Sequence, residues 1–311
     1  MTPAGGAGEW LVTLLSQTLR MAVPYACAGA GGIWSERSGI VNIALEGILL
    51  ASGLGAVVAH IATGSAWVGL LAGCAVGAAL GVVHALAVVS GGADAIVSGL
   101  AINLVAAGGT RFMLRALYAS SSNSPAVPAF AAAVSGATGG ALLVRTLLDP
   151  LFLAAVAVVG ASAWALAQTR FGLRVRACGE DPSAASSTGV DVRRTRILAV
   201  TLGGAIAGLG GVALAYDQHR FESGMSGGRG FIALAAVILS GWRPWPLGAA
   251  CVGFAALDAL QIAAQAETRV AGAVAQALPY VATLVVLGVM GARKRRGEGA
   301  AAPAALGKRN E

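Results

Sequence analysis

The sequence predicts an all-α fold, a polytopic bundle of transmembrane helices, and four features of its composition support this. Of the 311 residues, 57% are hydrophobic and 11% are charged, and the mean hydropathy is +0.76. Soluble domains carry roughly 25% charged residues, so we expect an integral membrane protein. The 45 glycines suit the close helix packing that is common in lipid.

Membrane-spanning helices are expected wherever about 17 to 25 consecutive residues are mainly apolar, because that length crosses the roughly 30 Å hydrocarbon layer. Nine stretches are apolar enough to be spans, although the seventh is short. The nine are 10–33, 40–62, 65–89, 95–117, 148–168, 195–216, 228–241, 246–264 and 273–290. Together they predict one transmembrane domain over residues 1–291.

Basic residues predict the orientation, because Lys and Arg in short loops collect on the cytoplasmic side. Of the 21 basic residues, 12 lie in two segments, six in the loop 169–194 and the first residues after it, up to Arg196, and six in the tail 292–311. Both segments are expected in the cytoplasm, and the loop 118–147, rich in Ser, Pro and Gly, is expected outside. The net charge of +7 follows from this asymmetry, so nucleic acid is not expected as a partner.

The side of the membrane on which the N-terminus lies depends on whether the segment 34–47 contains an additional crossing. Five of the nine spans precede the basic loop, which would place the N-terminus outside. An N-terminus inside requires a tenth crossing, and a broken or re-entrant helix near 34–47 is where we expect it. Such helices are tolerated at membrane depth where they line a cavity.

Small residues at four-residue intervals predict close helix contacts. Gly73, Gly77 and Gly81 share one face of the third span, and Gly204 and Gly208 repeat the interval in the sixth. Such faces let a neighbouring backbone approach closely. Packing within the bundle is favoured over a dimer interface.

Enzymatic and ion-coupled activities find little support in the sequence. Hydrolysis of ATP would require a Gly-rich phosphate loop that ends in Gly-Lys-Ser/Thr, but the lysines are Lys294 and Lys308 alone. An ion-coupled carrier needs ionisable groups deep in several spans, where the chain offers Glu46, Asp94 and Asp258. The three histidines and four cysteines lack metal-binding spacing, so we interpret them mainly as packing residues.

The loop 169–194 is expected to contain a short helix. Asp181 can cap a helix that begins at Pro182, and Gly189 is well placed to end it. From these residues alone, the helix is equally consistent with an ordinary surface loop and with a segment that docks in a groove on a partner.

Five segments carry a resemblance to a known family. They read Ser-Glu-Arg-Ser-Gly-Ile-Val-Asn-Ile-Ala-Leu-Glu-Gly at 35–47, Gly-Leu-Ala-Ile-Asn at 99–103, Arg-Ala-Cys-Gly-Glu-Asp-Pro-Ser-Ala-Ala at 176–185, Gly-Arg-Gly-Phe-Ile-Ala-Leu-Ala at 228–235 and Leu-Pro-Tyr-Val-Ala-Thr at 278–283. From about residue 20 to 291, the chain resembles the permease subunits of ABC-type importers. The similarity is to the branched-chain amino acid and ribose superfamily, and most closely to its nucleoside and simple-sugar branch.

The resemblance implies a transport subunit that works by alternating access and is not an enzyme. It implies about ten membrane helices with both termini in the cytoplasm, in a bacterial plasma (inner) membrane. The partners would be an ABC ATPase subunit that holds ATP and Mg²⁺, a second homologous permease, and an extracytoplasmic binding protein or lipoprotein. No cofactor is expected on this chain itself.

The resemblance also implies that the short cytoplasmic helix couples the permease to the ATPase. The residues that would form this contact are Gly179, Glu180, Ala184, Ala185 and Gly189. The family often has Asn at the position of Asp181, and Asp is an equally good helix cap.

Five polar or aromatic residues are candidates for the substrate path: Asn42, Glu46, Asn103, Gln218 and Phe221. Asn42 and Glu46 share a face if their segment is helical, and could bind ribose hydroxyls or base edges. They could instead brace a helix break, and this is favoured because a buried carboxylate first needs a partner. For Phe221, stacking on a base is a weaker alternative to plain packing.

Three functions follow in order of preference. The first is a permease subunit of an ATP-driven importer of nucleosides, and the second is the same machinery with a pentose or other simple sugar as its solute. The third is a stand-alone secondary carrier or channel, which would transport its solute without any ATPase.

Overall fold

The computed structural model describes residues 7–128, 130, 139–265, 281, 288 and 302–307. The described part of the chain is built from α-helices, with one π-helical turn, η1, directly after α3. In chain order they are α1 (Ala7–Arg37), α2 (Leu45–Thr63), α3 (Ala66–Ala85), η1 (Leu86–Ser90), α4 (Ala95–Tyr118), α5 (Gly139–Leu147), α6 (Pro150–Gln168), α7 (Arg170–Glu180), α8 (Pro182–Ser187), α9 (Val192–Asp217), α10 (Arg229–Leu239) and α11 (Pro244–Gln265).

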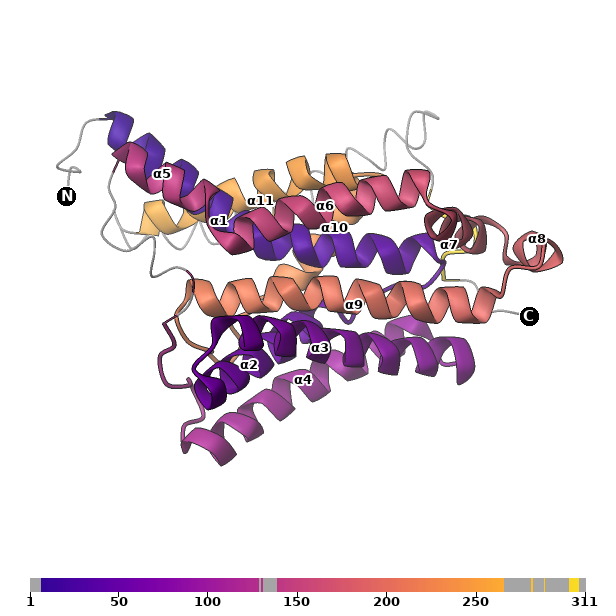
Figure 1. Cartoon of the computed structure of the whole chain (residues 1–311), viewed down its shortest axis with the longest axis horizontal. Helices are drawn as coiled ribbons and strands as arrows, with labels where there is room; N and C mark the ends of the chain where they lie inside the picture. The colour runs from indigo at the N-terminus through magenta and orange to yellow at the C-terminus, as the bar shows by residue number, and fades with distance from the viewer. Residues whose placement is uncertain are drawn as a thin grey trace.

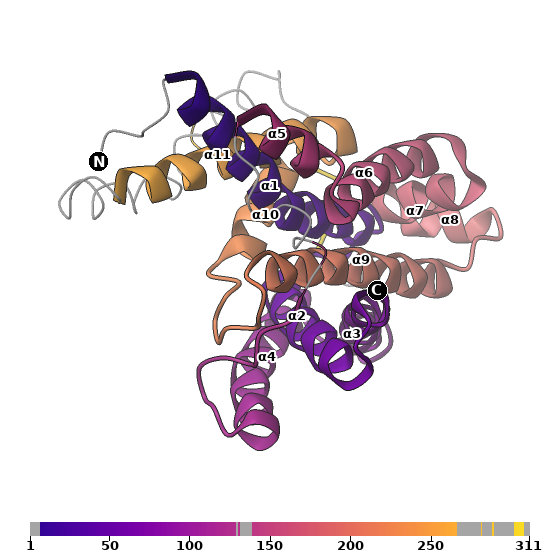
Figure 2. The same cartoon turned by 60° about the vertical axis from the view of Figure 1, so that its left-hand side comes forward.

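Helix α9 runs through the middle of the bundle (Figure 1). It packs against α1 on one side and against α2 and α3 on the other. Helices α6, α10 and α11 pack around α1, and α4 packs against α2. The view in Figure 2 keeps α2, α3 and α4 on one side of α9 and α1, α6 and α11 on the other.

The glycine faces of α3 and α9 meet inside this bundle. A Cβ atom on Gly77 would lie 2.3 Å from the carbonyl oxygen of Gly204, and one on Gly208 would lie 2.8 Å from that of Gly73. Only glycine permits such an approach, because these distances are shorter than any van der Waals contact. The prediction of packing within the bundle is therefore confirmed.

Six helices among the described residues are long and apolar enough to cross a membrane. They are α2, α3 continued by η1, α4, α6, α9 and α11, and each coincides with a predicted span. The nine or ten predicted spans are not confirmed. Helix α1 is long enough but is less apolar than these six, α10 has only 11 residues, and most of 273–290 lies outside the described residues.

The bundle has two distinct ends (Figure 1). We name the end with α7, α8 and the first turn of α9 the basic end, after its arginines. The opposite end, named the loop end, holds the last turns of α4 and α9. Helix α1 starts at the loop end and reaches the basic end at Arg37, so the first described turn lies opposite α7.

The expected extra crossing near 34–47 is not present. Helix α1 continues to Arg37, and the short non-helical segment 38–44 leads directly into α2. The helix is interrupted there, but the interruption connects α1 to α2 and adds no crossing of its own.

The described parts of the loop 118–147 lie at the loop end, opposite the basic loop, and they include helix α5, which was not expected from the sequence. The first part of this loop pairs with the connection between α9 and α10. Ser124 N donates to Phe221 O over 2.9 Å, and Ser223 N donates to Ser122 O over 2.7 Å. The two loops therefore hold each other in place.

Candidate functional site

The non-helical segment 38–44 is the centre of the candidate site. Peptide groups inside a membrane need partners within the protein, because no water is available there. Four groups from distant parts of the chain bind carbonyl oxygens of this segment. They are Arg196 Nε on Ser38 O at 2.9 Å, Gly307 N on Gly39 O at 3.1 Å, His84 Nε2 on Val41 O at 3.1 Å, and Asn103 Nδ2 on Ile43 O at 3.0 Å.

Glu46 joins the first turn of α2 to the first turn of α10. Its Oε1 accepts a hydrogen bond from Gly228 N and its Oε2 accepts one from Gly230 N, both at 2.8 Å. The free amides of a helix N-terminus carry partial positive charge, so an ionised carboxylate is a favourable partner. Both carboxylate oxygens are therefore engaged with α10.

Gly230 makes this contact possible. A Cβ atom at this position would lie 2.4 Å from the backbone nitrogen of Glu46, so only glycine lets the two helix starts approach. Helix α10 rises about 16 Å over its 11 residues, or half of the roughly 30 Å hydrocarbon layer. It is a half-length helix whose N-terminus lies inside the bundle, and the connection 218–228 leads to it from the loop end.

Asn103 braces the other side of the α2 start. Its Oδ1 accepts from Gly47 N at 2.8 Å while its Nδ2 donates to Ile43 O at 3.0 Å. Asn103 lies eight residues into α4, or about 12 Å along the helix axis. One amide side chain thus satisfies two backbone groups at the point where α2 begins.

Asn42 is completely buried within the break. Its Nδ2 donates to Ser35 Oγ at 3.0 Å, whereas its Oδ1 has no hydrogen-bond partner among the described residues. Asn42 and Glu46 do not share a helical face, because α2 begins only at Leu45. The condition for a common helical face is therefore not met.

The end of α1 connects this break to the basic end. Trp242 Nε1 donates to the buried carboxylate of Glu36, and Arg37 Nε donates to Trp242 O at 3.0 Å. Arg37 also lies 4.0 Å from a carboxylate oxygen of Glu180 in α7. Arg196 is buried and binds Cys178 O at 3.1 Å as well as the break.

Helices α7 and α8 form a projection at the basic end (Figure 1). Asp181 Oδ1 accepts hydrogen bonds from Ser183 N at 3.0 Å and Ala184 N at 2.9 Å, so it caps α8 as predicted. Gly189 has φ of +85° just beyond the helix, a conformation in which glycine is favoured. The predicted cap, start and end of this helix are confirmed.

The five predicted coupling residues lie on both faces of this projection. Gly179 packs against α1, where a Cβ atom would lie 2.1 Å from Arg37 O, and Ala185 lies on the buried face of α8. Glu180, Ala184 and Gly189 are exposed. The exposed face of α8 is small and smooth, since its side chains are those of alanine and serine.

The segment 302–307 docks beside these residues. Ala305 N donates to Gly179 O at 2.9 Å, and Ala304 N donates to Glu180 Oε2 at 3.2 Å. With the bond from Gly307 to Gly39, it ties α7 to the break. Residues 302–307 thus lie at the same end as the basic loop, whereas the charged residues of the tail lie outside the described residues.

Gln218 and Phe221 lie at the loop end, apart from the other three path candidates. Phe221 is fully buried in an apolar cluster between α2 and α9, and its backbone N donates to Ser124 Oγ at 3.0 Å. Its ring presents no open face to a solute in this conformation. Gln218 ends α9 and lines a cavity.

Sequence reasoning missed three residues that hold the break together. His84 was interpreted as a packing residue, and Arg196 was counted only as a basic loop residue. Trp242 carried no signal at all. A buried histidine or arginine at the end of a span needs a specific hydrogen-bond partner. The positions of His84 and Arg196 at the ends of predicted spans could therefore have indicated a bracing role.

Comparison with known families places the chain among membrane transport proteins. The family described as the branched-chain amino acid transport system, permease component, matches residues 14–290. No solved structure matches the chain.

Three characterised or named relatives align with most of the chain. The guanosine ABC transporter permease protein NupQ of Bacillus subtilis is 35% identical over 258 residues, which cover 79% of this chain and 81% of that protein. The nucleoside ABC transporter permease protein NupC of Lactococcus lactis is 32% identical over 304 residues, covering 89% and 92%. TsgC13 of Haloferax volcanii, provisionally named a glucose ABC transporter permease protein, is 36% identical over 261 residues, covering 81% and 78%.

Proposed function

Since the chain belongs to the family of branched-chain amino acid transport system permease components, we propose that it is the permease subunit of an ATP-driven nucleoside importer. Permeases of this family are not catalytic, and ATP is hydrolysed on a separate subunit. The observation that carries the choice of solute is the similarity to the guanosine and nucleoside permeases over about four fifths or more of the chain.

The geometry supports a gate built around the start of α2. Glu46 and Asn103 hold this start against α10 and α4 through four hydrogen bonds of 2.8 to 3.0 Å. Discontinuous helices of this kind surround solute sites near the midplane of many transporters. In the proposed mechanism, α2 and α10 move together as one unit because the carboxylate of Glu46 links them.

The projection α7–α8 is the proposed contact with the ATPase subunit. Ala184 and Glu180 offer an exposed surface, while Gly179 and Arg37 connect this surface to α1. A displacement of α8 would therefore be transmitted to the segment 38–44 through the end of α1 and through Arg196. No cofactor is proposed on this chain, and ATP with Mg²⁺ would stay on the partner.

The orientation follows from charge. With the basic end in the cytoplasm, the C-terminal segment is cytoplasmic and the loop end faces outward in a bacterial plasma membrane. The loop end would then receive the solute from an extracytoplasmic binding protein or lipoprotein. A second, homologous permease would complete the translocation unit.

The test is uptake of labelled solutes by cells that lack this chain and by the same cells with the chain restored. We expect restoration of guanosine or uridine uptake and unchanged uptake of ribose and glucose. Restoration of sugar uptake alone would replace the nucleoside proposal with the sugar alternative, which the similarity to TsgC13 favours.

The docking contact has its own test. Ala184→Trp together with Glu180→Trp places bulky side chains on the proposed contact, and Trp substitution of the exposed Gln168 at the same end serves as control. We expect the double variant to lose the ATPase subunit in co-purification while the control keeps it. Unchanged co-purification of the double variant would contradict the coupling role of α8.

A further inference from the structure

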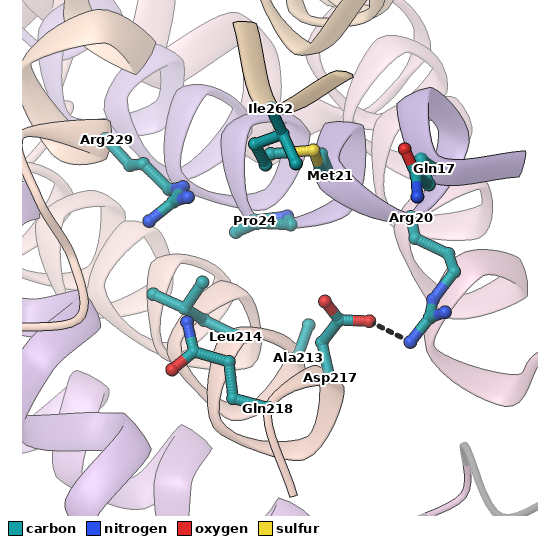
Figure 3. A pocket seen from close by; sticks show the side chains of 10 residues that line it. All are labelled: Gln17, Arg20, Met21, Pro24, Ala213, Leu214, Asp217, Gln218, Arg229 and Ile262. Atoms are coloured by element: carbon teal, nitrogen blue, oxygen red, sulfur yellow. Dashed lines mark ion pairs between the residues drawn. The ribbon is translucent and has the colours of Figure 1, made fainter. Parts of the chain in front are cut away.

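A second polar site lies between α1, α9 and α11 toward the loop end, apart from the break (Figure 3). It is a cavity of about 260 Å³. This volume lies slightly below the roughly 300 to 1,000 Å³ of typical small-molecule sites, so the cavity can hold no more than one small solute.

The polar lining offers both donors and acceptors of hydrogen bonds. Gln17 and Gln218 contribute amide groups, and Arg20 forms an ion pair with Asp217 at one side of the cavity (Figure 3). In the side chains of Gln17 and Gln218, the amide NH₂ group can donate hydrogen bonds and the amide oxygen can accept them.

The remaining lining is apolar and lies between the charged groups. Met21, Pro24, Leu214 and Ile262 form this part of the wall (Figure 3). A methionine sulfur makes favourable contacts with aromatic rings. The cavity therefore combines an apolar surface for a flat ring with groups that bind hydroxyls. A simple sugar would use the polar groups but would have no ring to place against the apolar surface.

The charge of Arg20 is matched within the protein, and Arg229 has polar partners. The ion pair neutralises Arg20, while Arg229 donates to Met225 O at 2.9 Å and interacts with Tyr25, whose hydroxyl group donates to Asp258. A solute therefore does not need to bring a negative charge to Arg20.

We propose that this cavity binds one neutral nucleoside in transit, with the base against the apolar wall and the sugar hydroxyls at Gln17, Gln218 and the ion pair. This inference rests on the proposed nucleoside import. Arg229 lies between Gly228 and Gly230, whose amides hold Glu46. A solute in the cavity thus contacts the same turn of α10 that is joined to the break.

The experiment uses cells that carry the complete transporter. Gln17→Leu and Gln218→Leu each remove a hydrogen-bonding amide, and Gln168→Leu at the basic end is the matched control. We expect the maximal rate of guanosine uptake to fall about three- to tenfold in the first two variants, as the loss of one hydrogen bond implies. The control is expected to match wild type.

A labelling measurement separates solute binding from a merely structural effect. Gln218→Cys is treated with a membrane-impermeant maleimide, with Gln17→Cys as the replacement if the first variant does not reach the membrane. We expect excess guanosine or uridine to slow labelling at least about threefold, as expected of a ligand that covers the side chain. Ribose, glucose and guanosine monophosphate are expected to leave labelling unchanged.

The outcomes distinguish this proposal from the function on which it rests. If wild-type cells import nucleosides but no nucleoside protects either cysteine, the cavity is not a nucleoside site and the proposed function stands. Equal protection by ribose or by the monophosphate overturns the assignment to a neutral nucleoside. If wild-type cells import no nucleoside through this transporter, the proposed function itself fails.

Discussion

Replacing Glu46 by Gln tests the joint between α2 and α10. The carboxylate accepts hydrogen bonds from the amides of Gly228 and Gly230, each at 2.8 Å. In Glu46→Gln, the remaining carbonyl oxygen can accept from one amide, but the NH₂ group cannot accept from the other. One amide of the α10 N-terminus therefore loses its partner inside the bundle.

The magnitude follows from these two contacts. A hydrogen bond to a charged group contributes about 1.5–3 kcal/mol, and a negative charge at a helix N-terminus adds about 0.3–1 kcal/mol. Glu46→Gln should therefore weaken the joint by about 2–4 kcal/mol. If the first turn of α10 opens locally, this corresponds to amide exchange that is about 30- to 1,000-fold faster.

Hydrogen exchange followed by mass spectrometry measures this on the purified chain. The peptide that contains residues 228–232 is compared between wild type and Glu46→Gln. Glu222→Gln is the matched control, since Glu222 is exposed and lies 3.7 Å from Arg220 on the loop, where an ion pair contributes only about 0–1 kcal/mol. Equal exchange in all three proteins would refute the proposed joint.

Two further predictions test the packing and the projection. Gly230→Ala places a methyl group against the backbone of Glu46 and should lower the free energy of unfolding by about 1–3 kcal/mol. Gly253 has open space around it, so Gly253→Ala should leave the free energy of unfolding unchanged. Thermal unfolding of both variants tests this, and equal midpoints would contradict the close contact at Gly230. Burial raises the pKa of the Cys178 thiol, and only the thiolate reacts. A maleimide at neutral pH should therefore label Ala184→Cys on the exposed face of α8 much faster than Cys178, and equal rates would contradict the structure.

Local features of the fold could be predicted from the sequence because their causes are local. Asp181, Pro182 and Gly189 lie within nine residues, and each acts on the backbone of its immediate neighbours, so the limits of α8 followed directly. The repeated glycines of α3 and α9 indicated close contacts in the same way. Their partners could be predicted only in kind, because spacing shows a face and not what covers it.

The candidate site was harder to predict because its contacts join distant segments. Glu46 was expected to need a partner, but that partner is a pair of backbone amides 182 and 184 residues away. Every residue except proline carries such an amide, so the sequence gives no indication of the pairing. The break was expected as an extra crossing because an N-terminus in the cytoplasm required one more span, and a count of apolar stretches does not show the path of the chain between them.

Dependence on the ATPase tests the central claim most directly. The measurement is uptake of labelled guanosine in cells that carry this chain together with an ATPase partner that lacks its P-loop lysine, the residue that contacts the nucleotide phosphates. A permease driven by ATP predicts uptake no greater than in cells that lack the chain. Uptake at the rate of unmodified cells would show that the chain moves its solute alone, as a carrier or channel, and would contradict the account.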